Sequence, residues 1–430
     1  EQEPNRAIIT SKWGEIETAE VKKDTQVRYL GGVKSPILTE VKKSDKVTVL
    51  EDEDDWMKVA TADGYVGYIK TKSLKNQKKE KTSRDFTEPV YSDMTEDHSI
   101  NMAWHNVTNA AANNAVQQVL ASTSGLTTIA PTWFSLADTE GNISSIADAD
   151  YGNYAHTAGL EVWAVFRDFH GGTNSYDETY ETLRYTSKRA KLEDQVVAAA
   201  VAAGVDGINL DFELISSKCG VHYVQLVREL SVKCHQNNLV FSVDNYVPQS
   251  YNSHYDLKEQ GIVADYVVIM AYDEHTEGSY EAGSVASISY LQDGIEKTLK
   301  KVSADKVIAG IPFFTRLWFE TAKSPEQLSE EAGTEAASYP NKVSSKALGM
   351  EEAAQSVVNA GATAQWDEKT QQNYAKWSAD GGTYRIWLED AQSLEAKLKV
   401  IQENKLAGVA EWKLGFENSG IWSVITENLS

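Results

Sequence analysis

Hydrophobic positions along most of the chain fall into short runs that alternate with longer amphipathic stretches. Eight apolar runs recur after residue 99, at residues 100–105, 127–134, 161–166, 207–213, 239–246, 266–273, 307–314 and 408–415. The stretches between them carry apolar residues at the three- and four-residue spacing of a helix face, as in residues 187–203, 221–236, 290–302 and 393–403. Eight strands that alternate with helices predict an α/β fold, a closed parallel (β/α)8 TIM barrel.

The interval between the seventh and eighth runs is longer than the others and has its own pattern. Residues 362–366, 374–377 and 383–387 have the composition of short strands, and Gly381-Gly382 marks a turn before the last of them. We therefore predict a small α+β insertion at about residues 320–388. Because the loops that follow barrel strands lie on the active face, we expect this insertion to wall one side of a site.

The first eighty residues differ from the rest. Short β-rich runs at residues 26–30, 46–50, 56–61 and 65–70 are separated by turn signals such as Gly31-Gly32 and Asp63-Gly64. They predict a small all-β barrel at residues 21–74, preceded by an N-terminal extension at residues 1–20. A charged, apolar-poor run opens residues 75–97, which we interpret as a linker to a barrel domain at residues 98–430.

Composition narrows the function. The chain has 430 residues, with 41 Lys and Arg against 63 Asp and Glu, so its formal charge is −22. That charge repels phosphate backbones and anionic bilayers, and we expect no nucleic-acid partner. No apolar run approaches the roughly 18 residues of a membrane span, so we expect none. The chain begins with Glu1 rather than Met, which leaves export open.

The two cysteines are expected to be free thiols. Cys219 and Cys234 lie at the two ends of the helix predicted at residues 221–236. At about 1.5 Å per residue, that helix holds them roughly 20 Å apart. A disulfide requires Cα atoms within roughly 7 Å of each other.

Polar side chains interrupt the fourth apolar run on one face. The run reads Asp206-Gly207-Ile208-Asn209-Leu210-Asp211-Phe212-Glu213. Because side chains alternate along a strand, Asn209, Asp211 and Glu213 share one face. A barrel strand is buried on both faces, so such a stripe is costly unless it serves a site. The alternative is a satisfied structural network, or a strand end that reaches solvent.

Two carboxyls at alternate positions suit general acid catalysis. They cannot ionise independently, and burial raises the pKa of the less solvated one. Glu213, at the outer end, is placed to donate a proton to a leaving group, while Asp211 stays charged beneath it. This pairing suits glycoside hydrolysis, whose transition state is cationic. The spacing alone leaves open whether Asp211 acts as a direct nucleophile.

The run from Asp206 to Glu213 resembles the signature strand of glycoside hydrolase family 18, the chitinases and related N-acetylglucosaminidases. In that family the pattern is Asp-x-x-Asp-x-Asp-x-Glu, and this chain has Asn209 at the second Asp. By this resemblance, Asp206 and Gly207 have structural roles in the motif and do not contact substrate. The resemblance does not predict loss of activity, because several bacterial cell-wall members carry Asn there. A neutral amide is expected to alter the acid limb of the pH profile.

Two further runs extend the resemblance over roughly residues 100–422. Met270-Ala271-Tyr272-Asp273 is similar to the family's sixth strand, and residues 408–415, which include Trp412, are similar to its eighth. By resemblance, Tyr272 hydrogen-bonds the substrate acetamido group, Met270 and Asp273 line the same subsite, and Trp412 forms the floor under the reacting sugar. The implied reaction is substrate-assisted and retaining: the sugar's 2-acetamido oxygen attacks the anomeric carbon while Glu213 protonates the leaving oxygen.

Other aromatic residues near strand ends are candidates for sugar stacking. They are Trp104, Trp133 and Trp318, and for each of them packing in the core is an alternative of equal weight. The third run departs from the family pattern, because Arg167 and Asp168 stand where many chitinases have small residues. We find no phosphate loop and no His or Cys pairs at metal-ligand spacing, so we expect neither a cofactor nor a metal.

The N-terminal segment resembles a bacterial SH3-like domain, on Trp56, Val59 and residues 63–69. Such modules commonly recognise cell-wall peptides, which favours peptidoglycan as substrate and a secreted or wall-associated protein of a Gram-positive bacterium. Chitinase activity and endo-N-acetylglucosaminidase activity on N-glycans are the alternative enzyme functions. A lectin-like wall protein without catalysis, or a wall-anchored scaffold, is the alternative of another class.

Overall fold

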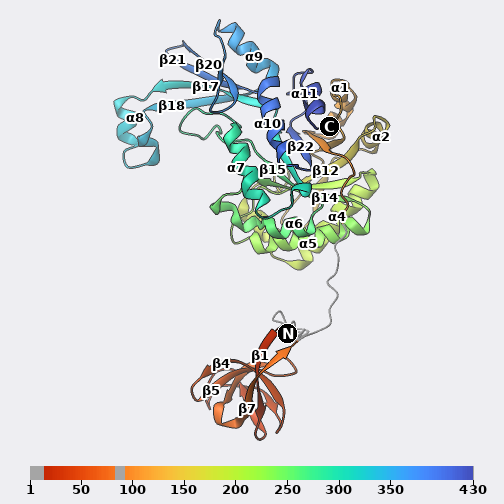
Figure 1. Ribbon diagram of the computed structural model, residues 1–430, viewed down its shortest axis with the longest axis vertical. Coiled ribbons are helices and arrows are strands. Elements are labelled where there is room, and N and C mark those ends of the chain that lie inside the picture. The colour runs from red at the N-terminus through yellow and green to blue at the C-terminus, as the bar shows by residue number, and fades with distance from the viewer. Residues whose placement is uncertain (1–13, 83–92, 430) are drawn as a thin grey trace. The chain divides into compact units, whose positions relative to one another are not determined.

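The computed structural model describes residues 14–82 and 93–429, and the chain divides into two compact units, residues 1–90 and 91–430 (Figure 1). Each unit has its own hydrophobic core. Among the described residues, no helix combines the length and the apolar character needed to span a membrane.

The N-terminal unit is a seven-stranded antiparallel sheet in the order β3-β2-β6-β5-β4-β1-β7. Val21, Val27, Val47, Met57 and Val59 are among the residues of its core. The all-β prediction for this segment is therefore confirmed. The strands are β1 Gly14–Val21, β2 Thr25–Arg28, β3 Ile37–Val41, β4 Lys46–Glu53, β5 Trp56–Ala60, β6 Val66–Lys70 and β7 Leu74–Thr82.

The sheet of this unit extends on both sides of the predicted domain at residues 21–74. Strand β1 lies partly within the predicted extension at residues 1–20, and β7 lies within the predicted linker at residues 75–97. The charged residues that suggested a linker pair across these two strands, as Lys75 with Glu20 at 2.9 Å and Lys79 with Glu15 at 2.9 Å. The rest of the predicted linker, residues 83–92, lies outside the described residues.

The second unit is the predicted barrel. Its eight parallel strands are β8 Ile100–His105, β9 Thr128–Pro131, β12 Glu161–Arg167, β13 Gly207–Asp211, β14 Val240–Tyr246, β15 Tyr266–Met270, β16 Val307–Pro312 and β22 Gly408–Trp412. They pair in the order β12-β13-β14-β15-β16-β22-β8-β9, and β9 also pairs with β12, which closes the barrel. The second predicted strand is divided, because β10 Phe134–Leu136 follows β9 and forms a hairpin with β11 Ile143–Ser145.

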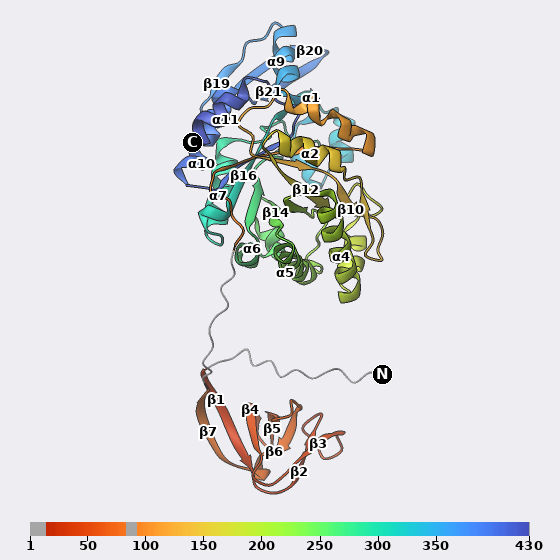
Figure 2. The same cartoon turned by 90° about the vertical axis from the view of Figure 1, so that its right-hand side faces the viewer.

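Helices surround the barrel (Figure 2). Their apolar faces are buried against it. The four predicted helices are present as α4 Thr186–Ala203, α5 Gly220–Gln236, α7 Ile288–Leu299 and α10 Ala391–Glu403. Cys219 and Cys234 are both free and buried, as predicted. The other helices are α1 Val116–Leu120, α2 Ala149–Thr157, α3 Tyr176–Leu183, α6 Leu257–Val263 and α11 Ile421–Leu429; 3-10 turns are η1 Thr71–Ser73, η2 Ala110–Ala115, η3 Ser250–Tyr255, η4 Ala304–Lys306 and η5 Glu335–Ser338.

The predicted insertion forms a separate five-stranded antiparallel sheet, in the order β18-β17-β21-β20-β19, which Figure 1 shows beside α8 and α9. It begins earlier than predicted, because β17 starts at Phe314, two residues after β16 ends. Its own core includes Leu348, Ala375 and Ile386. The elements are β17 Phe314–Ala322, α8 Pro325–Glu330, β18 Asn341–Gly349, α9 Met350–Asn359, β19 Gln365–Asp367, β20 Gln372–Ala379 and β21 Gly382–Leu388.

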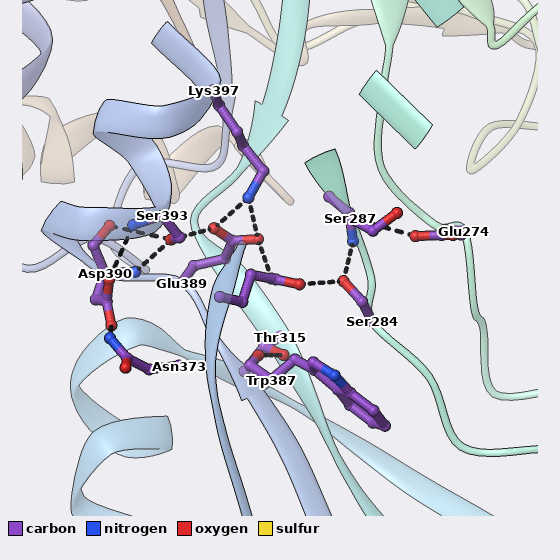
Figure 3. Close-up of polar contacts among 12 residues, drawn as sticks. Glu274, Ser284, Ser287, Thr315, Asn373, Trp387, Glu389, Asp390, Ser393 and Lys397 are labelled. Carbon is purple, nitrogen blue, oxygen red and sulfur yellow. Dashed lines mark hydrogen bonds and ion pairs between the residues drawn. The ribbon is translucent and has the colours of Figure 1, made fainter. Parts of the chain in front are cut away.

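A buried polar network joins the insertion to the barrel (Figure 3). Lys397 on α10 donates to both carboxylate oxygens of Glu389, at 2.9 and 2.8 Å. Ser393 donates to the same carboxylate at 2.8 Å, and Gln372 on β20 does so at 2.8 Å. Ser284, in the loop after β15, in turn donates to Gln372. The network therefore ties the insertion to the loop that follows one of the barrel strands.

Candidate active site

A cavity of about 190 Å³ lies where several barrel strands end. Its lining comes from or just beyond the carboxyl ends of β8, β12, β13, β14, β15 and β22, which is the face where barrel enzymes hold their sites. The predicted residues that line it are Trp104, Asp211, Glu213, Met270, Tyr272, Asp273 and Trp412. The structure therefore brings residues from four separate sequence segments into one pocket.

Glu213 lies two residues beyond the end of β13, as the strand stripe predicts. The Tyr246 hydroxyl on β14 donates a hydrogen bond to the Glu213 carboxylate. The backbone N–H groups of Glu213 and Leu214 both donate to Asp168, at 2.9 and 3.0 Å. These bonds fix the turn that holds the Glu213 side chain in the pocket.

The surroundings of Glu213 favour its protonated form. Burial raises its pKa, and the nearby Asp273 carboxyl raises it further, whereas the bond from Tyr246 lowers it. A carboxyl that keeps its proton near neutral pH can serve as a general acid. Burial also raises the pKa of Asp168 to about 7.

Asp211 occupies the middle of a row of polar side chains on three neighbouring strands. The strand register pairs it with Arg167 on β12. On the other side, Leu210 pairs with Val243, so the same register places Asp211 beside Asp244. Burial raises the pKa of Asp211, as do the charges of Glu213 and Asp244, whereas Arg167 lowers it.

Asn209 lies beneath the pocket rather than on its surface, and it is fully buried. Its amide nitrogen donates to Asp244 at 2.7 Å and to Ser242 at 2.9 Å, and its oxygen accepts the Trp104 indole N–H at 3.1 Å. The sequence predicted that Asn209 binds substrate; in the structure its side chain instead hydrogen-bonds Asp244 and Trp104.

Aromatic rings enclose the pocket. Trp104 packs edge-on against Tyr272, with ring centroids 6.4 Å apart, and lies 6.0 Å from the ring of Trp412. Trp412 is half-buried, so part of its indole is accessible. Met270 and Asp273, which flank Tyr272, also line the cavity. Such a pocket offers flat apolar faces next to hydrogen-bonding groups, as sugar sites require.

Two predicted sugar-binding residues lie outside this pocket, which corrects the prediction for them. Trp133 is 2% exposed, donates its indole N–H to Asn113 at 2.8 Å and packs on Tyr151. Trp318 is fully buried in the insertion and donates to the Gly283 carbonyl at 2.9 Å. Neither ring has a free face on which a sugar could stack.

Asp206 and Gly207 lie at the opposite end of β13. Asp206 accepts hydrogen bonds from the Val162 backbone and from His156, both at 2.8 Å. At Gly207 a Cβ atom would lie 2.8 Å from the Trp163 ring, closer than packed atoms allow. Both positions therefore serve the fold.

The structure adds pocket residues that the sequence analysis did not assign. Asp244 and Tyr246 come from β14, and Arg167, Phe169 and His170 come from the end of β12. The alternation that revealed the β13 stripe also applies to β14, where residues 242, 244 and 246 are polar on one face. That signal could have identified Asp244 and Tyr246.

Within the described ranges, no group of three His, Cys, Asp or Glu side chains is arranged to hold a metal ion. The polar groups that line this pocket include four carboxyls, two phenols, an amide, an imidazole and a guanidinium. The chemistry that they can perform by themselves is proton transfer and the stabilisation of positive charge.

Comparison with known proteins decides the family. The profile of Glycosyl hydrolases family 18 matches residues 102–417, which is most of the barrel unit. The chain belongs to this family. It is accordingly a glycosidase. The profile of the Bacterial SH3 domain matches residues 22–75, so this family 18 chain also carries an SH3 domain.

Relatives of this family 18 chain include glycosylases of Bacillus subtilis. The Uncharacterized glycosylase YvbX is 25% identical over 282 residues, which cover 63% of this chain and 76% of that protein. The Cortical fragment-lytic enzyme is 27% identical over 256 residues, covering 57% of this chain and 54% of that protein. This chain is thus similar to about half of the latter.

Solved structures confirm the fold. The spore cortex-lytic enzyme SleL of Bacillus megaterium superposes with a TM-score of 0.64 at 20% identity, over 79% of this chain and 76% of that one. A chitinase from Chromobacterium violaceum gives a TM-score of 0.64 at 21% identity, over 77% of this chain and 99% of that one. At such identities the likeness shows the fold alone.

Proposed function

We propose that this family 18 glycosidase hydrolyses β-1,4-linked N-acetylglucosamine polymers by substrate assistance, with retention of configuration. The observation that carries the proposal is the position of Glu213, a carboxyl held at a pocket in surroundings that favour its proton. Asp211 and Tyr272, which follows β15, line the same cavity. Acid, charge stabiliser and acetamido-binding groups then meet in one cavity.

In this mechanism Glu213 donates its proton to the glycosidic oxygen as the bond to the anomeric carbon breaks. The acetamido oxygen of the same sugar forms the new bond to that carbon, which gives a cyclic cation. Asp211 accepts the acetamido N–H and offsets the positive charge, while the Tyr272 hydroxyl orients the acetamido group. Ionised Glu213 then takes a proton from water, which adds to the anomeric carbon and reopens the ring.

Peptidoglycan is the substrate that we propose within this class. One relative is named a cortical fragment-lytic enzyme. The SH3 domain also has a cavity of about 490 Å³, lined by Trp56 and by four cationic residues, Lys23, Arg28, Lys70 and Lys72, against two acidic ones, Asp24 and Glu40. A cationic groove on a chain of charge −22 suits an acidic wall peptide. Attachment there would raise the effective concentration of wall glycan at the barrel.

The test compares wild type with Glu213→Gln on a chromogenic N-acetylglucosamine oligomer. Because Gln keeps the shape but has no acidic proton, we expect turnover to fall by about 10² or more while the oligomer still binds. A Glu213→Gln variant that turns over at the wild-type rate would contradict the acid assignment. Binding without hydrolysis by the wild type would instead favour the lectin-like alternative.

The substrate is tested on three glycans in parallel: peptidoglycan strands, chitooligosaccharides and N-glycans. We expect the highest kcat/KM on the peptidoglycan strands. Deletion of residues 1–90 should lower the rate on intact walls but leave the rate on short oligomers unchanged, because attachment adds no catalytic contact. If the enzyme hydrolysed none of the three glycans, the proposed substrate class would be wrong.

A further inference from the structure

Asp244 is a buried carboxyl whose environment the proposed reaction does not yet explain. It is 2% exposed and lines the catalytic cavity from β14. One of its oxygens, Oδ1, accepts the Asn209 amide at 2.7 Å. The other, Oδ2, has no hydrogen-bond partner among the described residues.

Asp211 has a matching unpartnered atom. It is 8% exposed, and its Oδ1 also has no hydrogen-bond partner within the described part of the chain. The register between β13 and β14 places the two carboxyls side by side on the lumen face, on strands that are about 4.8 Å apart. Two buried acceptor oxygens in neighbouring positions are unfavourable unless a proton lies between them.

We propose that Asp244 is a positioning residue that carries a proton on Oδ2 and donates it as a hydrogen bond to Asp211. Arg167, opposite Asp211 on β12 in the strand register, works against the burial that raises the pKa of Asp211 and so favours its ionised form. The row then reads guanidinium, carboxylate, carboxylic acid across three adjacent strands. Both orphan oxygens are satisfied, and Asp211 is oriented from its buried side.

The geometry explains why the amide at Asn209 matters. An amide nitrogen can only donate to Asp244 Oδ1, so it fixes that carboxyl and leaves Oδ2 as the position for the proton. Asn209 itself has no proton to share with Asp211. The acidic neighbour of Asp211 is therefore supplied by the next strand rather than by the same one.

Charges around Asp244 agree with a protonated group. Burial raises its pKa to about 8, and the charge of Glu213 adds to this, whereas the Asn209 bond and the nearby Trp104 indole N–H oppose it. Asp211 faces Asp244 from β13. Burial raises the pKa of Tyr272, which follows β15, and of Tyr223 on α5, and the charges of Asp244 and Asp211 raise both further. Across the residues that the structure describes, no cation is among the groups that act on Asp244 directly.

The inference rests on the proposed hydrolase function, but its first test does not use activity. Infrared difference spectra of wild type against Asp244→Asn, recorded near neutral pH, report the carbonyl band of a protonated carboxyl. We expect a band that is present in the wild type and lost in the variant. Spectra without such a band would overturn the proposal, whether or not the enzyme is active.

The second test separates a hydrogen-bond donor from a charge. The side-chain amide introduced by Asp244→Asn can still donate to Asp211, so this variant should keep kcat within about threefold, whereas Asp244→Leu should lose about tenfold or more. Oligomer binding and thermal stability of both variants confirm that each is folded. If kcat falls as far in Asp244→Asn as in Asp244→Leu, or if neither substitution changes kcat, the proposal is wrong. A wild type inactive on every oligomer would contradict the hydrolase function instead, since the infrared band reports Asp244 alone.

Discussion

Removing the ammonium group of Lys397 should destabilise the barrel unit, because it leaves the carboxyl of Glu389 buried without its cation. Lys397 and Glu389 are 1% and 0% exposed at their side chains. Substitution by Met keeps the length and apolar stem of the lysine but removes both bonds to the carboxylate. Glu389 then keeps only its bonds from Ser393 and Gln372.

Breaking a buried ion pair from one side costs about 3–5 kcal/mol. Two donors remain here, so we expect about 3 kcal/mol, which at about 2 °C per kcal/mol for a unit of this size lowers Tm by about 6 °C. Burial raises the pKa of Glu389 even beside Lys397, and removing the ammonium raises it further. In the folded variant Glu389 keeps its proton to higher pH than in the folded wild type, so the cost relative to the wild type grows as pH rises through the raised folded-state pKa of wild-type Glu389 and is smallest below that pKa.

The assay is thermal unfolding of the full chain, followed by near-ultraviolet circular dichroism at pH 4 and pH 7. The matched control is Lys397→Met combined with Glu389→Gln, which removes both charges and should recover most of the loss. A single variant that loses less than about 1 kcal/mol at pH 7, or a double variant no more stable than the single one, would refute the reasoning.

Three further changes test the pocket and the strand beneath it. Tyr246→Phe removes the bond that lowers the pKa of Glu213; the general acid then keeps its proton to higher pH, so the alkaline limb of kcat/KM should move upward, and an unmoved limb would argue against this bond. Trp412→Ala removes an accessible ring face from the cavity; KM for an N-acetylglucosamine oligomer should rise about tenfold, and an unchanged KM would exclude Trp412 from binding. Gly207→Ala places a Cβ 2.8 Å from the Trp163 ring and should lower the free energy of unfolding by about 1–3 kcal/mol, as measured by chemical denaturation. An unchanged free energy of unfolding would mean that the ring moves aside without cost.

The barrel could be predicted because its signals are local. Each strand is a short apolar run and each helix repeats its apolar face, so the pattern depends little on distant residues. The predicted bounds of β8, residues 100–105, agree with the structure. The polar stripe on β13 was equally local, since Asn209, Asp211 and Glu213 follow one alternation.

Strand β7 could not be predicted in this way, because its stability depends on a partner more than fifty residues away. Its lysines match glutamates of β1, with Lys79 opposite Glu17 and Lys75 opposite Glu20 in the register. Read alone, such a run has the composition of a solvated linker. Only the pairing shows that its charges are neutralised across the sheet.

Tryptophan positions show a second limit of the sequence. Trp104 and Trp133 lie near strand ends and Trp318 lies in the middle of β17, and of the three only Trp104 reaches the cavity. The difference comes from partners distant in the chain, since Asn113 binds the indole of Trp133 and the Gly283 carbonyl binds that of Trp318. A residue's place in a strand does not reveal which neighbours enclose it.

The central claim is that the substrate's own acetamido group, and no side chain, attacks the anomeric carbon. The most direct measurement is proton NMR of the first product released from an N-acetylglucosamine oligomer, alongside the same reaction on an oligomer that lacks the 2-acetamido group. We predict that the β-anomer is released first and that the second substrate is not hydrolysed. Initial release of the α-anomer, or comparable hydrolysis of the substrate without the acetamido group, would contradict it.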